Sequence, residues 1–220
     1  PSAYPSDMTM DFFTYAGAPG AYNLALGGGA GVWWKPGDFS ISTSYLSADA
    51  ELSNPNEGGF MTDAAGASAT TQIAYAPENW GIAGAFTYAS GFEGGGALYS
   101  GNGTPAAVDL SASGNTYSYG ISAWWMPEES GWIPSVSAGW GLTDIPDSEI
   151  VGVKSATTQS WYVGLEWSDV FIEGNSFGIA AGQPTFVSSM DTNGDDDLYI
   201  PGAGYAWEFF YKFQVTDNIT

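Results

Sequence analysis

Hydrophobic and polar positions alternate with a period of two along most of this 220-residue chain. The alternation is clearest in YAWEFFYKFQV, residues 205–215, where every second residue is aromatic or aliphatic. Side chains on a β-strand point alternately to the two faces of the sheet, so this spacing is typical of strands. It predicts nine strands, over residues 21–34, 39–45, 71–76, 82–88, 116–125, 136–142, 161–167, 177–180 and 205–215, with a tenth beginning at 219–220.

The strands recur in a repeated unit of strand, turn, strand and loop. Three phrases share one motif, an aromatic strand end followed by proline and an acidic residue: VWWKPGDFSIS, IAYAPENWGIA and AWWMPEESGWIPSVS. These turns are short, and we predict that a long acidic loop follows each pair of strands without exception. Such an asymmetry between the two edges of a sheet is typical of outer-membrane barrels, which have short periplasmic turns and long outer loops.

The two faces of the predicted sheet differ in composition. One is apolar and rich in aromatic residues, and we expect lipid to contact it at Tyr117, Ile121, Trp161, Leu165, Trp207 and Phe209. Aromatic residues beside the short turns are expected to form one interfacial girdle: Trp33, Trp34, Tyr75, Trp80, Trp124, Trp125, Trp167 and Phe213. The other face is small and weakly polar, and its predicted pore-lining, water-facing residues are Gln72, Ser118, Ser122, Tyr162, Glu166, Glu208, Lys212 and Gln214.

Charge supports this division of the faces. The chain has 24 acidic residues and a formal net charge of −21, yet only 12% of its residues are charged. Nearly all acids fall in predicted loops, and only Glu166, Glu208 and Lys212 lie clearly inside predicted strands, on the non-aromatic face. A lipid-facing surface must exclude charge, because a lysine at mid-bilayer costs about 2–4 kcal/mol. The alternative is a secreted, soluble β-sandwich or adhesin with acidic, calcium-binding loops.

Composition excludes several other functions. Three lysines and no arginine argue against nucleic-acid binding, which needs cationic partners for phosphate. The chain has no cysteine and no histidine, which removes thiolate chemistry and the commonest general base. No apolar run is long enough for a membrane-spanning helix. Glu166 and Glu208 resemble the carboxylate pair of a glycosidase, but no other catalytic group accompanies them, so we interpret them as pore-lining and expect no enzyme.

One acidic loop has the composition of a calcium site. The stretch DTNGDDD, residues 191–197, offers four oxygen-bearing side chains, those of Asp191, Asn193, Asp195 and Asp197. It lacks the glycine position and the late glutamate of an EF-hand loop. A solvated acidic loop is the alternative reading, and no other cofactor is expected.

The phrases AWWMPEESGWIPSVSAGWG, NSFGIAAGQPTFV and AWEFFYKFQVTDNIT resemble the carbohydrate-selective porin family (OprB-like), and within it the cyanobacterial outer-membrane porins. The resemblance covers most of the chain from about residue 21 onward. It implies a homotrimer of barrels with about 16 strands each, and an N-terminal surface-layer-homology domain, outside these residues, that binds peptidoglycan in the cell wall. Family members that favour sugars use arginine at the constriction. The absence of arginine here points to inorganic ions, including iron, which the cyanobacterial branch is linked to.

Together these observations predict an all-β protein, a portion of a larger antiparallel transmembrane β-barrel. Residues 1–220 would form part of one porin barrel, with N-terminal and C-terminal parts of the full protein missing. The expected function is passive diffusion of small solutes and inorganic ions through a water-filled channel in the outer membrane.

Overall fold

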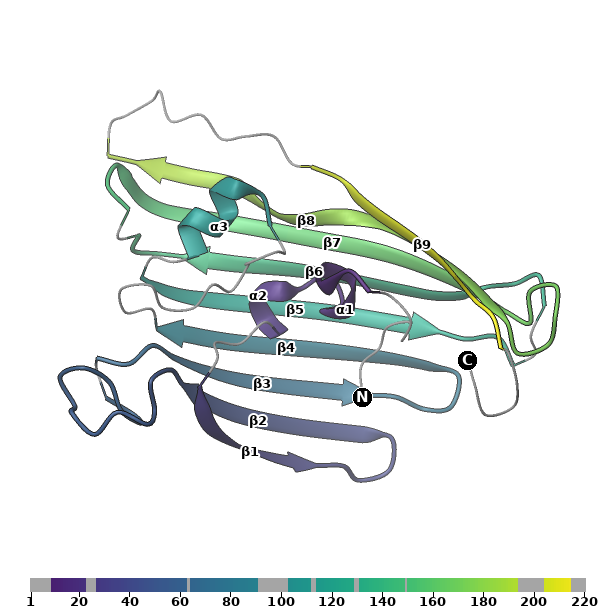
Figure 1. Ribbon diagram of the computed structural model, residues 1–220, viewed down its shortest axis with the longest axis horizontal. Coiled ribbons are helices and arrows are strands. Elements are labelled where there is room, and N and C mark those ends of the chain that lie inside the picture. Colours follow the sequence, from purple (N-terminus) through teal and green to yellow (C-terminus); the bar gives the residue numbers. More distant parts are fainter. Residues whose placement is uncertain are drawn as a thin grey trace.

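The computed structural model describes residues 9–22, 27–62, 64–90, 103–111, 114–128, 131–148, 150–193 and 204–214. Within these residues nine antiparallel strands form one open sheet, and each strand pairs with its neighbours in the sequence (Figure 1). The strands are β1 (Gly28–Trp34), β2 (Phe39–Ser47), β3 (Ala67–Tyr75), β4 (Trp80–Ser90), β5 (Asn115–Trp125), β6 (Ser135–Ile145), β7 (Val153–Ser168), β8 (Ser176–Thr192) and β9 (Ala206–Lys212). The prediction of an all-β, antiparallel chain is confirmed at this level.

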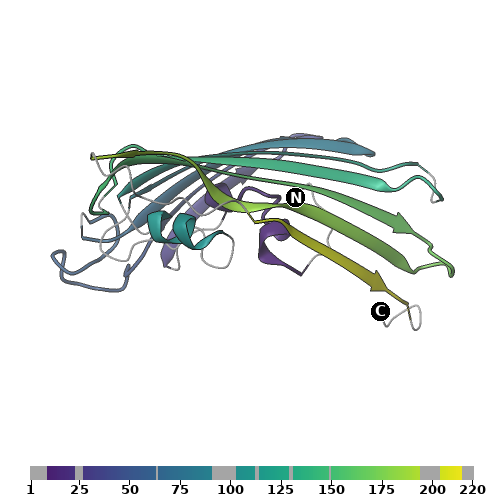
Figure 2. The same cartoon turned by 90° about the horizontal axis from the view of Figure 1, so that it is seen from above.

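The described part of the chain has three short helices beside the sheet: α1 (Asp11–Thr14), α2 (Pro19–Tyr22) and α3 (Pro105–Ser111). All three lie on the same side of the sheet, which curves around them (Figure 2). The sequence pattern predicted none of them, and it assigned residues 21 and 22 to the first strand. That assignment is wrong, because Ala21 and Tyr22 end α2 and β1 begins only at Gly28. Among the described residues, no helix is long and apolar enough to cross a membrane.

The nine predicted strands are all present, but β6, β7 and β8 extend well beyond their predicted ends. Three charged residues therefore lie within strands near the loops: Asp144 in β6, Lys154 in β7 and Asp191 in β8. The prediction that only three charges lie inside strands is wrong for this reason. Asp144 also pairs with Tyr117 and so lies on the aromatic face. At the extended ends of β6, β7 and β8, backbone pairing continues after the hydrophobic alternation has stopped. The sequence pattern shows the alternation but not the pairing.

The connections define two edges, which we call the turn edge and the loop edge. At the turn edge, residues 35–38, 76–79, 126–134 and 169–175 join successive strands. At the loop edge, residues 48–66 and the segment containing α3 are long. The connection between β6 and β7, residues 146–152, is as short as the turn 169–175. The predicted alternation of short turns and long loops therefore fails once, because the lengthened β6 and β7 shorten the loop between them.

Burial is concentrated on the face that carries the helices. One cluster packs α3 through Ala107 and Leu110 against Ile145, Val153 and Val187 of the lengthened strands. Another packs Phe12 and Phe13 against Tyr162 and Ala180, and a third packs Ala18 and Ala21 against Ala85. The hydrophobic core thus lies between the helices and one face of the sheet.

Candidate functional site

The face opposite the helices is apolar and exposed. The register places Trp34, Ile41, Ile73, Gly84, Ile121, Trp140 and Trp161 in one row across seven strands. Large side chains in this and the adjoining rows stay open to the surroundings, for example Ile121 at 48%, Phe209 at 59% and Trp207 at 63% exposure. An apolar surface of this extent is unusual on a soluble monomer and marks an interaction surface.

An aromatic band follows the turn edge of this face. Trp34, Tyr75, Trp80, Trp125 and Trp167 lie there because each is at or next to the turn-edge end of its strand. Tyr75 and Trp80 are in edge-to-face contact at 5.5 Å between ring centroids. Two members of the predicted girdle are wrong. Trp33 pairs with Ser42, and Trp124 pairs with Ser137, so both lie on the opposite face. Adjacent residues of a strand point to opposite sides, so each Trp-Trp pair contributes only one ring to the band.

A second aromatic band lies nearer the loop edge, and the sequence analysis missed it. Tyr88 contacts Tyr117 with ring centroids 5.3 Å apart, Phe86 contacts Tyr119 at 5.2 Å, and Tyr45 lies in the same row as Tyr88. The span from Tyr117 to Trp125 along β5 is about 27 Å at the usual rise per residue. The tyrosines at the ends of predicted strands 39–45, 82–88 and 116–125 that lie away from the short turns could have indicated this second band.

The helix-bearing face is built from small and weakly polar residues. The predicted lining residues within strands share this face: Gln72, Ser118, Ser122, Tyr162, Glu166, Glu208 and Lys212. Gln214 lies beyond the end of β9 and is exposed. Three of the set do not face water, because Ser118, Ser122 and Tyr162 are 0%, 3% and 1% exposed. For these three the expectation of water contact is wrong, and the lining role of the others stays a prediction.

A segment close to the N-terminus covers this face. Residues 9–22, which we call the docked segment, carry α1 and α2 and contribute Phe12, Phe13, Ala18 and Ala21 to the buried core. Phe13 is fully buried, and its ring lies 5.1 Å from that of Phe12 and 6.0 Å from that of Tyr162. Aromatic pairs at such distances add to the stabilisation that burial alone provides. The docked segment is therefore packed as firmly as an ordinary protein core.

Glycines of the sheet make room for the docked segment. A Cβ atom at Gly139 would overlap the carbonyl oxygen of Ala16, and one at Gly120 would come within 2.9 Å of Ala18 Cβ. At Gly141 it would lie 2.8 Å from Ala18 Cα. The segment turns at Ala16 and Gly17, whose φ angles of 53° and 64° are both left-handed. The flat surface at these glycines allows the backbone of the segment to lie directly on the strands.

Polar side chains of the sheet hold the docked segment at three points. Ser160 donates a hydrogen bond of 2.7 Å to the Gly17 carbonyl, and Thr87 donates one of 2.8 Å to the Ala21 carbonyl. The Glu208 carboxylate accepts hydrogen bonds from the Thr9 amide (2.8 Å), the Thr9 hydroxyl (2.7 Å) and the Met10 amide (2.9 Å). Hydrogen bonds to a charged acceptor are stronger than neutral ones. Glu208 therefore anchors the start of the segment.

This anchoring role bears on the carboxylate pair seen in the sequence. Glu208 and Glu166 share a face but lie on β9 and β7, with β8 between them. The carboxylate oxygens of Glu208 are both used by Thr9 and Met10. The structure therefore gives Glu208 a positioning role within the chain.

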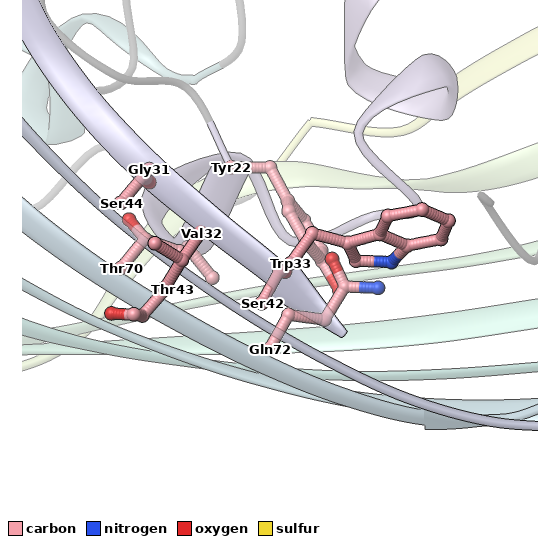
Figure 3. A pocket seen from close by; sticks show the side chains of 10 residues that line it. Tyr22, Gly31, Val32, Trp33, Ser42, Thr43, Ser44, Thr70 and Gln72 are labelled. Carbon is pink, nitrogen blue, oxygen red and sulfur yellow. The ribbon is translucent and has the colours of Figure 1, made fainter. Parts of the chain in front are cut away.

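An open cavity of about 370 Å³ remains beside the docked segment, at the β1 side of the sheet. Tyr22 of the segment, Trp33 of β1 and Gln72 of β3 line it, and the Gln72 side chain extends toward the Trp33 indole (Figure 3). Burial raises the pKa of Tyr22, and a hydrogen bond with Ser122 opposes this effect, so the phenol stays neutral at physiological pH. Of the predicted lining residues, Gln72 is thus placed where a solute can reach it.

The predicted calcium loop lies mostly outside the described residues, including Asp195 and Asp197. Asp191 and Asn193 are described, and Asp191 forms an ion pair of 3.4 Å with Lys154 across β7 and β8. Both side chains of this pair are well exposed, so the pair contributes little to stability. Within the described part of the chain, no group of three or more acidic residues is arranged to hold a metal ion. Calcium binding by this loop stays a prediction.

Comparison with known proteins finds two relatives from cyanobacteria. An uncharacterized protein of Nostoc sp. is 30% identical over 219 residues, which cover 93% of this chain and 34% of the relative. An uncharacterized protein of Synechocystis sp. is 28% identical over 218 residues, which cover 88% of this chain and 38% of the relative. No protein-family model matches the sequence, and no solved structure matches it. The chain spans little more than a third of the length of these relatives, and most of its sheet lies within the shared region.

Proposed function

We propose that this chain forms part of the wall of an outer-membrane porin of the carbohydrate-selective (OprB-like) type, in its cyanobacterial branch. The observation that carries the proposal is the sorting of the two faces. One face is apolar, aromatic and exposed, and the other is small, weakly polar and covered in part by the docked segment. The apolar face would contact lipid, and the other would line a water-filled lumen for passive diffusion of small solutes and inorganic ions.

The chemistry of the apolar face supports contact with lipid. Its rows between the two aromatic bands hold no charged residue in the described strands. A polar group in these rows finds a partner, since the Trp161 indole donates a hydrogen bond of 2.6 Å to the Gln183 amide oxygen. Barrels in outer membranes present an apolar band about 25 Å tall between two aromatic girdles. The bands of this sheet have a comparable separation.

The described sheet is open, whereas strands that span a membrane must form a closed barrel. The outer edges of β1 and β9 have no partner strand among the described residues. Unpaired backbone groups are too costly in lipid, so a barrel must complete its pairing with further strands. The resemblance implies about 16 strands in total, arranged as trimers and attached to peptidoglycan by a separate domain. We therefore propose the strand number, the trimer and the attachment to the cell wall together with the porin function.

The distribution of acids predicts the ion preference of such a pore. The described acids of the loop edge are Asp49, Glu51, Glu57, Asp109, Asp144, Asp147 and Asp191. Negative charge at a mouth with low-dielectric walls concentrates cations, over a range of about 8–10 Å at physiological salt. We expect modest cation preference at low salt that vanishes at molar salt. Reversal potentials across a KCl gradient at two ionic strengths measure this.

The same recording tests the proposed function itself. Full-length protein in planar bilayers is expected to give stable conductance steps. Anion preference would contradict the assignment of the acidic edge to the mouth. Absence of conductance, together with protein that stays in solution without detergent, would instead favour the soluble adhesin alternative.

A further inference from the structure

We propose that the docked segment, rather than the bare strand wall, sets the size limit for solutes in this pore. This inference rests on the proposed function and deepens it. The docked segment, residues 9–22, makes its core contacts on the face assigned to the lumen. Packing and hydrogen bonds hold it there, and it narrows the space available to solutes.

The segment crosses the lumen face from β9 to β4. Glu208, which holds its start, lies on β9 and pairs with Ala180 of β8. Thr87, which holds Ala21, lies on β4 and pairs with Ser118 of β5. Between these points the segment passes over β7, β6 and β5 at Tyr162, Gly141 and Gly120. A solute that moves along the wall formed by β4 to β9 therefore passes the segment, and the cavity beside β1 to β3 is the space that remains open.

The segment is fixed in place. Phe12 and Phe13 are almost fully buried, and the three hydrogen-bonded anchors are spread along its length. A helical turn with its side chains is about 10 Å across, so an element of this thickness on the wall removes a substantial part of the open cross-section. The cavity lined by Tyr22, Trp33 and Gln72 shows that the segment itself forms a boundary of the remaining space.

Gly120 offers a substitution that releases the segment and spares the strand. A Cβ atom there would come within 2.9 Å of Ala18 Cβ and 3.1 Å of Ala21 Cβ, both in the docked segment, while the strand itself favours a β-branched residue over glycine. Gly120→Val therefore opposes docking of the segment. Gly84→Val is the matched control, because a Cβ at Gly84 would have no neighbour nearer than 4.0 Å. Glu208→Gln is a milder second variant, which removes the charged acceptor for Thr9 and Met10.

The experiment compares these variants in full-length protein in planar bilayers and in liposomes that swell with neutral sugars of increasing size. In Gly120→Val we expect single-channel conductance to rise by roughly 1.5- to 2-fold, given the width of the helical turns removed, and larger sugars to enter. Gly84→Val should leave both unchanged, and Glu208→Gln should give a smaller rise. In the two glycine variants the reversal potential should not change, because no charged residue is altered.

Release of the segment is measured separately. Ser160 is buried and bonded to Gly17, and the chain has no native cysteine. Ser160→Cys should react with a water-soluble maleimide only when combined with Gly120→Val. Labelling without a change in conductance or sugar size would overturn the inference and leave the porin intact. Labelling of Ser160→Cys alone, or no labelling in the double variant, would contradict the docked position that the inference needs. A wild-type protein without conductance would remove the proposed function and the inference with it.

Discussion

Ile121→Lys is expected to lower the free energy of unfolding of the bilayer-inserted protein by about 2–4 kcal/mol, the cost of a lysine near the bilayer midplane. Ile121 lies on β5 between the two aromatic bands, is 48% exposed, and pairs with Gly84 and Trp140 in the central row of the apolar face. Lipid cannot solvate the ammonium group, whereas water can. The measurement is reversible unfolding of the full-length protein by guanidinium in lipid vesicles.

Val151→Lys provides the control for this substitution. Val151 lies in the connection between β6 and β7 and is 96% exposed, so a lysine there should change stability by less than about 0.5 kcal/mol. If Ile121→Lys proved equally harmless, the apolar face would be in contact with water. That result would contradict the assignment of the face to lipid.

The second large effect concerns the aromatic anchor of the docked segment. Phe13→Ala should destabilise the docking of residues 9–22 by about 3–5 kcal/mol, the usual loss for truncating a fully buried phenylalanine. The ring contacts Phe12 and Tyr162, and its removal leaves a cavity against β7. Hydrogen–deuterium exchange read by mass spectrometry should show faster exchange in residues 9–22 and unchanged protection in the central strands.

Phe60→Ala is the comparison for this change. Phe60 lies in the connection between β2 and β3 and is about half exposed, where it contacts only the Tyr45 ring among aromatic residues described. Its truncation should leave exchange in residues 9–22 unaltered. If Phe13→Ala also left that exchange unaltered, the burial of Phe13 would not be what holds the segment to the sheet.

The strands were predictable because local alternation determines them. Tyr117, Tyr119, Ile121 and Trp125 fall at odd positions of residues 116–125, and all four lie exposed on the face that this parity indicated. Nearest-neighbour pairing also followed from short connections such as residues 35–38 and 76–79. The ends of β6 to β8 were not predictable, because their pairing there is supported by α3 and its contacts with Ile145 and Val153.

The docked segment could not be predicted for a different reason. Its partners are distant in sequence: Glu208 lies almost 200 residues from Thr9, and Ser160 lies 143 residues from Gly17. Gly120, Gly139 and Gly141 gave no sign of their role, because a glycine on a small-residue face is equally consistent with an open lumen. Only the close approach of Ala16 and Ala18 to these glycines shows that another segment packs on them.

In a porin, the apolar face of this sheet must contact hydrocarbon and the helix-bearing face must contact water. The test is electron paramagnetic resonance of single nitroxides at Ile121→Cys and Gln72→Cys, in cysteine-free full-length protein reconstituted in vesicles. We expect the label at position 121 to collide more with oxygen than with a water-soluble nickel chelate, and the label at position 72 to show the reverse order. A label at position 121 that collides mainly with the nickel chelate would place the apolar face in water and contradict the account.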